Sequence, residues 1–216
     1  MSAKRDLYEL VDKRGNSISP FVFRVKAVLG YKDLEYKTIQ LTFQDIQTQI
    51  PSILPLGKKE VPILVEDTIP IQDSAAIYKH LELNYPNKPI PEGPIKNFNE
   101  GELFMAGIPL SVNIVNVVAD QDVDYVESKI NNLTKRSSKD CLEPAIYNEG
   151  VRRWREKCKE ISELLKDHGD EVTYTLITLA SIVHWVSSIA GEENTFGDNE
   201  FLKNWFTEFK KKVNVK

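Results

Sequence analysis

Hydrophobic and polar residues alternate along the first half of the chain in short runs that favour strands and helices in turn. Residues 6–11 and 36–41 have the two-residue periodicity and β-rich composition of strands. Residues 61–65 and 69–72 are apolar runs separated by three polar residues, which predicts an antiparallel hairpin. A polar segment at 42–60 reads as a loop or a short helix. This order of elements predicts a mixed sheet with a right-handed crossover.

Two helices in this half have clear start and stop signals. Ser19 suits the N-cap of the first helix, Pro20 suits its first position, and Gly30 can close its far end. Between those ends, apolar residues recur at helical spacing: Phe21, Val25, Val28 and Leu29. A later helix begins at Asp73 and stops before Pro86.

The second half of the chain reads as helical throughout. Residues 86–94 contain four prolines and a glycine, which marks a domain boundary, and we expect domains over 1–88 and 89–216. Helical periodicity then covers four segments: 123–133, 147–165, 173–190 and 201–213. The segment at 176–189 is apolar on most sides, so we expect it to be the central buried helix, too short and too polar to span a bilayer.

Composition and charge narrow the functional classes. The 216 residues are 41% hydrophobic and 28% charged, a composition that is typical of a soluble globular protein. The formal net charge of −4 argues against nucleic acid or a membrane as the main partner, because both require a basic surface. Cys141 and Cys158 give no disulfide framework, and the charged N-terminus has no signal peptide, so we expect a cytoplasmic protein. Three scattered histidines have no metal-ligand spacing, so we expect no metal.

Three motifs occur in an order that matches a known family. Ser19-Pro20-Phe21 precedes a helix, Val61-Pro62 precedes the hairpin, and Gln72-Asp73-Ser74 opens the next helix. With the helical half behind them, they make the chain resemble the cytosolic glutathione transferases over nearly its whole length. The stretch at 19–24 is most similar to the etherase-like classes of fungi and bacteria, with the zeta class more distant, and residues 179–185 resemble the buried helix of fungal members.

This resemblance implies a fold and a function. The fold is α/β plus all-α: a thioredoxin-like glutathione-binding domain followed by an all-helical domain. The function is transfer of glutathione, the co-substrate, to a hydrophobic electrophile in detoxification, by a cytoplasmic homodimer. We expect the electrophile between the domains. The walls of this cleft would come from the loop after the first strand and from residues 103–118, including Ile114, Val115, Val117 and Val118.

Ser19 is the candidate for activating the glutathione thiol. A free thiol titrates at about 8.5, and a hydroxyl donor at the positive end of a helix favours the thiolate. The resemblance places the activating residue just before the Pro-Phe dipeptide, which is Ser19 here. Two alternatives stay open: Ser19 only caps the helix, or Ser17 faces the sulfur instead. Neither position is a cysteine, which disfavours a disulfide mechanism.

The resemblance also implies where the two ends of glutathione bind. A cis proline at Pro62 leaves the backbone of Val61 free to pair with the cysteinyl part, against an ordinary trans proline opening an edge strand. Asp73 and Ser74 hold the γ-glutamyl carboxylate at a helix N-terminus, where an N-cap is the simpler role. For the glycyl carboxylate, Lys59 is the candidate.

Two departures from the family pattern keep other functions open. Glu60 stands where the family has lysine or glutamine, so either an inserted residue lets Lys59 reach round or the glycyl contact is weak. Leu176 stands where related chains complete a capping box begun at Thr173, which costs on the order of 1 kcal/mol. A weakly catalytic carrier or regulatory protein of the same fold, or a structural adaptor that has lost the ligand, therefore remains as an alternative.

Overall fold

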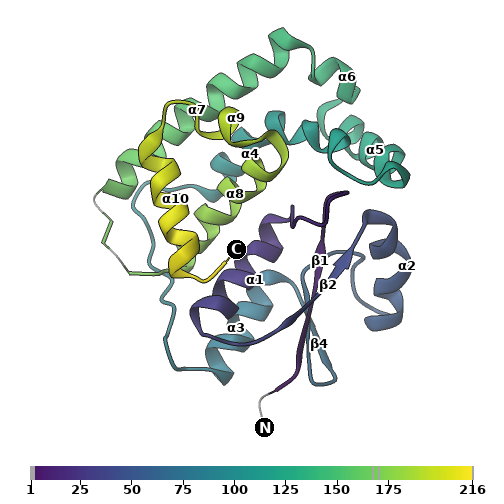
Figure 1. Ribbon diagram of the computed structural model, residues 1–216, viewed down its shortest axis with the longest axis vertical. Coiled ribbons are helices and arrows are strands. Elements are labelled where there is room, and N and C mark those ends of the chain that lie inside the picture. Colours follow the sequence, from purple (N-terminus) through teal and green to yellow (C-terminus); the bar gives the residue numbers. More distant parts are fainter. Residues whose placement is uncertain (1–2, 167, 170, 216) are drawn as a thin grey trace.

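The computed structural model describes residues 3–166, 168–169 and 171–215, and it has two parts (Figure 1). The N-terminal part is a small sheet with three helices, and the C-terminal part is entirely helical. None of the described helices is long and apolar enough to cross a membrane. The expected fold class, a thioredoxin-like domain followed by a helical domain, is confirmed.

The sheet has four strands in the order β2-β1-β3-β4. The strands are β1 (Arg5–Leu10), β2 (Lys37–Leu41), β3 (Ile63–Glu66) and β4 (Ile69–Gln72). Strand β1 pairs in parallel with β2, where Leu7 lies opposite Thr38, and antiparallel with β3, where Leu7 lies opposite Leu64. Strands β3 and β4 form the predicted antiparallel hairpin. A mixed sheet with a helical crossover between its parallel strands is therefore confirmed.

That crossover is helix α1, Pro20–Tyr31, which begins after Ser19 as predicted. Its far end differs from the prediction, because Gly30 lies inside the helix and Lys32 is the C-cap. Gly30 is needed for packing: a Cβ there would overlap the backbone carbonyl of Val213, near the C-terminal end of the described chain. Helix α3, Ser74–Asn84, follows β4 directly and has Asp73 as its N-cap.

The polar segment after β2 folds as helix α2, Phe43–Ile53. Its start is a capping box in which the Thr42 hydroxyl accepts from the Asp45 backbone while the Asp45 carboxylate accepts from the Thr42 backbone. Ile46 and Ile50 are its buried residues, and they belong to an apolar cluster that also contains Leu10 and Ile63 of the sheet. A mostly polar helix is thereby held on the sheet by one narrow apolar stripe.

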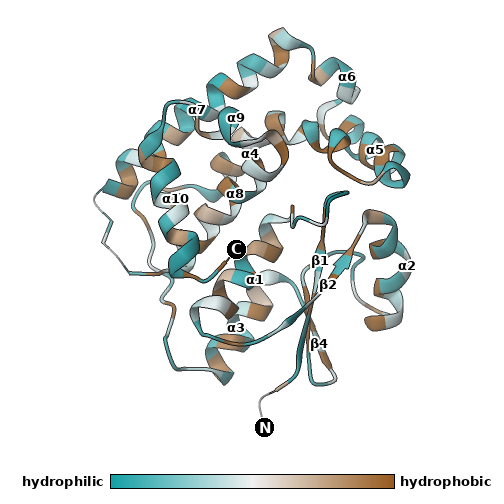
Figure 2. Cartoon of the chain, viewed as in Figure 1, coloured by the Kyte–Doolittle hydropathy of each residue, from teal (hydrophilic) through white to brown (hydrophobic). Residues whose placement is uncertain are grey.

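The helical part is built around α8, Tyr174–Ala190, whose N-cap Thr173 accepts from the Leu176 backbone as expected. Around it lie helices α4 (Glu100–Ser111), α5 (Val123–Thr134), α6 (Ser138–Cys141), α7 (Pro144–Lys166), α9 (Glu192–Phe196) and α10 (Glu200–Lys212), with 3-10 turns η1 (Val112–Asn116) and η2 (Asp120–Asp122). Twelve residues of α8 are buried, which confirms it as the central helix. Figure 2 shows the contrast between apolar α8 and the hydrophilic faces of α7 and α10.

Helices α1 and α8 pack against each other and join the two parts. Arg24 of α1 is buried there, and its Nε donates to the Ser181 hydroxyl at 3.0 Å while its guanidinium pairs with Glu100 of α4. Phe23 stacks on His184 with ring centroids 4.7 Å apart. The contact between the two parts is thus a packed core in which the buried Arg24 side chain has hydrogen-bond partners.

Candidate active site

Ser19 stands at the N-terminus of α1, on the side of the sheet where β1 ends. Its backbone is extended, with φ −88° and ψ 125°, and its Oγ accepts a hydrogen bond from the Val22 N–H at 3.3 Å. The residue is 6% exposed. Because this bond uses the hydroxyl only as an acceptor, the O–H proton remains available to donate to a ligand atom. The positive end of the helix favours an anion at the same place.

The loop from β1 to Ser19 is fixed by its own hydrogen bonds. The buried Asp12 carboxylate accepts from the backbone N–H groups of Arg14 and Asn16, both at 2.8 Å, and from the Asn16 side chain at 3.0 Å. Burial alone would raise the pKa of Asp12, but the hydrogen bonds from Asn16 and Arg14 outweigh it, so the pKa is lowered. The Ile18 N–H returns to the Leu10 carbonyl at 3.2 Å. Ser19 is therefore presented by an ordered turn.

A cavity of about 290 Å³ lies beside α1, between the α2–β3 loop and the start of α3. It is lined by Phe21, Leu56, Gly57, Lys58, Glu60, Val61, Pro62, Gln72, Asp73 and Ser74. We call it the polar cavity. It gathers the second and third sequence motifs at one place, and the Val61–Pro62 peptide bond is cis, as the resemblance implied. Within the described part of the chain, the backbone of Val61 forms no hydrogen bond, so its N–H and C=O stay free for a ligand.

Asp73 and Ser74 present different groups to this cavity. The Asp73 carboxylate accepts from the backbone of Ala75 and Ala76, at 2.9 and 3.1 Å, so it caps α3. The backbone of Asp73 has φ +83°, a conformation that residues other than glycine rarely adopt. Residues held in such conformations cluster at ligand sites and active sites. Ser74 is 5% exposed and is among the residues that line the cavity. A hydroxyl at a helix N-terminus is suited to bind a carboxylate.

A second cavity, of about 320 Å³, opens between α2 of the first part and α5 of the second, and we call it the apolar cavity. It is lined by Leu10, Ser19, Phe43, Ile46, Gln47, Lys59, Glu60, Val61, Ile114, Tyr125, Val126, Lys129, Ile130 and Leu133. In Figure 1, α2 and α5 face each other beside the end of β1. Glu60 and Val61 line both cavities, so the two cavities are neighbours, with Ser19 in the wall of the apolar one.

The expected walls of this cleft are only partly those found. Of the apolar cluster in the second part, Ile114 lines the cavity, whereas Val118 is buried in the core. Most of the wall on that side comes from α5, and on the other side from α2. Phe43 and Tyr125 meet across the two parts with ring centroids 5.5 Å apart. Sequence reasoning missed these lining residues because the contact between α2 and α5 depends on tertiary structure.

Ser17, the alternative to Ser19, lies in a different place. It lines a third cavity on the α8 and α10 side, with His184 and Lys26 among its neighbours. Its Oγ is buried and has no hydrogen-bond partner within the described structure. Its carbonyl accepts from His184 Nε2 at 3.1 Å. Ser17 lines neither the polar nor the apolar cavity.

The lysines before Val61 are divided between the two cavities. Lys58 lines the polar cavity and Lys59 the apolar one. Gln72 fixes this loop: its side-chain oxygen accepts from the Lys58 N–H at 2.9 Å, and its Nε2 donates to the carbonyls of Lys58 and Glu60, at 2.6 and 2.9 Å. Gln72 belongs to the third sequence motif, but its role in ordering this loop was not predicted.

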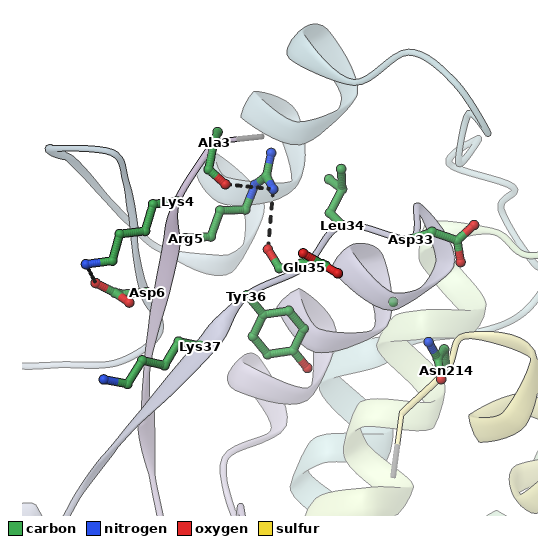
Figure 3. A pocket seen from close by; sticks show the side chains of 11 residues that line it. Ala3, Lys4, Arg5, Asp6, Asp33, Leu34, Glu35, Tyr36, Lys37 and Asn214 are labelled. Atoms are coloured by element: carbon green, nitrogen blue, oxygen red, sulfur yellow. Dashed lines mark hydrogen bonds and ion pairs between the residues drawn. The ribbon is translucent and has the colours of Figure 1, made fainter. Parts of the chain in front are cut away.

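A larger cavity, of about 740 Å³, lies elsewhere, at the start of β1 and β2 (Figure 3). Of the three cationic side chains that line it in the described chain, Lys4 and Arg5 have partners, and the third is that of Lys37. Arg5 pairs with Glu66 at 2.8 Å and donates to the carbonyls of Ala3 and Glu35, and Lys4 pairs with Asp6 at 3.5 Å. Among the described lining residues, the hydroxyl is that of Tyr36, which is not at a helix N-terminus and whose pKa is raised by burial, so a phenolate is disfavoured there. The candidate active site is therefore the smaller pair of cavities.

Comparison with known proteins identifies a related family domain and related folds. Residues 15–89 match the family model of the glutathione S-transferase N-terminal domain. A glutathione S-transferase of Ceriporiopsis subvermispora, crystallised with glutathione, superposes over 96% of this chain and 97% of its own, with a TM-score of 0.77 and 18% identity. The chain has the glutathione transferase fold.

Other proteins share this fold with the chain at low sequence identity. A glutathione transferase from Phanerochaete chrysosporium superposes with a TM-score of 0.73 at 18% identity, covering 98% of each chain. In sequence, a probable maleylacetoacetate isomerase of Caenorhabditis elegans is 38% identical over 77 residues. That match covers 34% of this chain and only 35% of the isomerase. The similarity in sequence is thus confined to about a third of each protein.

Proposed function

We propose that the protein is a glutathione transferase in which Ser19 stabilises the thiolate of glutathione for attack on a hydrophobic electrophile. The observation that carries this proposal is the position of Ser19. Within the described structure, its hydroxyl accepts a hydrogen bond from Val22 but donates none, and it stands at the positive end of α1. Ser19 also lines the apolar cavity, which is next to the polar cavity. Ser17 lines neither cavity, which supports Ser19 over Ser17.

Glutathione would bind across the polar cavity. The γ-glutamyl carboxylate would accept from the Ser74 hydroxyl and the start of α3, and the cysteinyl backbone would pair with the free N–H and C=O of Val61. The glycyl carboxylate would extend toward Lys58 and Lys59, which precede Val61. Pairing at Val61 would bring the sulfur toward the apolar cavity, whose wall includes both Val61 and Ser19.

The proposed reaction needs no group beyond these. The thiol loses its proton to water, and the thiolate is held by the Ser19 O–H and the α1 dipole. The sulfur then attacks an electrophilic carbon in the apolar cavity, such as an activated aromatic carbon or an aryl ether. A carbon–sulfur bond forms and the leaving group departs with the electron pair of the bond that breaks. The apolar side chains around the site hold the electrophile and exclude water.

Substitution of Ser19 tests the proposal. Ser19→Ala removes a charge-assisted hydrogen bond worth about 1.5–3 kcal/mol, so turnover of a generic aromatic electrophile at neutral pH should fall roughly ten- to hundredfold. Glutathione affinity should stay nearly intact, because the ends of the tripeptide supply most of the binding. Ser17→Ala is the control and should do much less.

A second variant separates the thiol donor from the helix cap. Glycine is a good N-cap, so Ser19→Gly should lower stability by only a few tenths of a kcal/mol. It should nevertheless lose as much turnover as Ser19→Ala. Full activity in Ser19→Gly would mean that the hydroxyl only caps α1. Full activity in both variants would assign thiol activation to a backbone N–H.

A carrier function is the alternative, and Glu60 favours it, since an acidic side chain stands beside the expected glycyl carboxylate. Retention on glutathione-agarose without turnover of any electrophile would select the carrier. We further propose a cytoplasmic homodimer with a detoxifying role. Sedimentation equilibrium should then give twice the 24.7 kDa chain mass at micromolar concentration.

A further inference from the structure

His184 of α8 contacts the loop that carries Ser19, although the two segments are far apart in sequence. Its Nε2 lies 3.1 Å from the Ser17 carbonyl oxygen, across 167 residues of chain. A carbonyl can only accept, so Nε2 carries the proton and donates. The imidazole also stacks on Phe23 of α1, with centroids 4.7 Å apart. One side chain of the helical part therefore contacts both the turn before Ser19 and the helix after it.

The peptide group that His184 contacts is fixed at both ends. Its carbonyl, from Ser17, accepts from His184, and its N–H, from Ile18, donates to the Leu10 carbonyl at 3.2 Å. The Ile18 side chain is 2% exposed and packs in the apolar cluster with Leu10. Ser19 follows this peptide directly. A rotation of the Ser17–Ile18 peptide would move the Ser19 hydroxyl, and hydrogen bonds at both ends prevent that rotation.

We propose that His184 is a positioning residue that holds the Ser17–Ile18 peptide from the helical part, so that the Ser19 hydroxyl points at the sulfur of bound glutathione. This inference rests on the proposed function. The imidazole touches neither the polar nor the apolar cavity, so it acts only through the loop. The helical part thereby contributes to thiol activation as well as to the electrophile cavity.

Two substitutions of His184 separate the contribution of the aromatic ring from that of the N–H donor. His184→Phe keeps an aromatic ring against Phe23 but has no donor, whereas His184→Gln keeps a donor and loses the ring. Misplacement of a reacting group by about 1 Å can cost up to a hundredfold in rate. We expect His184→Phe to lower kcat roughly five- to twentyfold, with the KM for glutathione changed less than about twofold.

The ultraviolet absorbance of the thiolate in the glutathione complex gives a second readout. In His184→Phe, the pH at which bound glutathione ionises should rise by about half to one unit. In His184→Gln, this pH should lie much closer to the wild-type value. Ser188→Ala is the matched control, since its hydroxyl lines the same third cavity but only bonds to the Trp185 carbonyl of its own helix. It should leave kcat and the ionisation of bound glutathione unchanged.

The outcomes distinguish this inference from the proposed function. If the wild type ionises glutathione through Ser19 and His184→Phe does the same at the same pH, the positioning role is wrong and the proposed function stands. A loss in His184→Gln with little or none in His184→Phe would assign the effect to ring packing and overturn the role of the N–H. If the wild type binds glutathione without ionising it, the proposed function fails and this inference fails with it.

Discussion

The Asp122 carboxylate binds the backbone of Phe43 at the start of α2, with Oδ2 2.9 Å from the Phe43 nitrogen. Its other oxygen accepts from the Gln44 N–H, also at 2.9 Å. Asp122 is 2% exposed and belongs to η2 of the helical part, 79 residues away from Phe43. A helix of the first part thus has a carboxylate of the second part at its N-terminus, where the helix dipole favours negative charge.

Removal of this carboxylate should destabilise the protein. Asp122→Ala removes the charged acceptor from the N–H groups of Phe43 and Gln44. Each such bond is worth about 1.5–3 kcal/mol, and water can replace part of the bonding because Gln44 is exposed, so we expect a loss of roughly 2–4 kcal/mol. Asp122→Asn keeps one acceptor and should lose less. Urea unfolding measures both. The exposed Asp120 of the same turn is the control, and Asp120→Ala should change stability by no more than about 0.5 kcal/mol. Equal effects at both positions would contradict a capping role.

A glycine pair tests the packing of the C-terminal segment on α1. Alanine normally stabilises a helix by about 0.5–1 kcal/mol relative to glycine. Gly101 of α4 has room for a methyl group, so Gly101→Ala should raise the melting temperature. Gly30→Ala should instead lower it, because the new Cβ overlaps the Val213 carbonyl. Thermal melts of the two variants should therefore move in opposite directions, and a stabilised Gly30→Ala would show that the segment is not held there.

Glutathione affinity should depend on Ser74. Ser74→Ala removes the hydroxyl that we assign to the γ-glutamyl carboxylate, a hydrogen bond worth roughly 1.5–3 kcal/mol, so the dissociation constant should rise about ten- to hundredfold. Calorimetric titration with glutathione measures it. The exposed Ser52 of α2 bonds only to the Gln49 carbonyl of its own helix, and Ser52→Ala should bind as the wild type does. Unchanged affinity in a folded Ser74→Ala protein would refute the assignment.

His184 should make stability depend on pH below neutrality. Burial lowers the pKa of His184 from 6.5 to about 4, and the nearby Lys210 and Lys26 act in the same direction, against the hydrogen bond to Ser17. The unfolded chain therefore binds a proton that the folded protein does not between pH 6.5 and 4. Stability falls as the pH decreases through this window, by about 3 kcal/mol at most.

The difference in stability between the wild type and His184→Phe isolates the titration of His184 from that of the carboxylates. In urea unfolding, the free energy of unfolding of the wild type should fall relative to that of His184→Phe as the pH decreases from 6.5 toward 4. Curves that stay parallel would mean that the imidazole titrates as it does in the unfolded chain.

Local signals in the sequence predicted much of the fold. The start of α1 followed from Ser19 and Pro20, because an N-cap and a proline act on adjacent residues. The hairpin followed from two apolar runs and a short polar turn. Helix α2 was not resolved from a loop, since Pro51 lies inside it and only a narrow stripe of its surface is apolar. Its capping box at Thr42 was the signal that could have found it.

The sequence predicted the motif residues that line the candidate site, but it did not predict the residues that contact them. Ser19, Val61, Pro62 and Ser74 line neighbouring cavities, as their resemblance to a known pattern implied. The contact of His184 with Ser17 and that of Asp122 with Phe43 were not predictable, because they join segments 167 and 79 residues apart. Such pairs depend on how α8 and η2 are placed in space, which periodicity along the chain does not specify.

The apolar cavity has α2 on one side and α5 on the other, and this arrangement has a thermodynamic consequence. A molecule bound there contacts both parts of the chain, so it is a noncovalent cross-link that exists only while both parts are folded. At a concentration a hundred times its dissociation constant it would stabilise the protein by about 2.7 kcal/mol. Because neither part alone forms the cavity, that free energy couples their unfolding, and an occupied protein should unfold more cooperatively than an empty one.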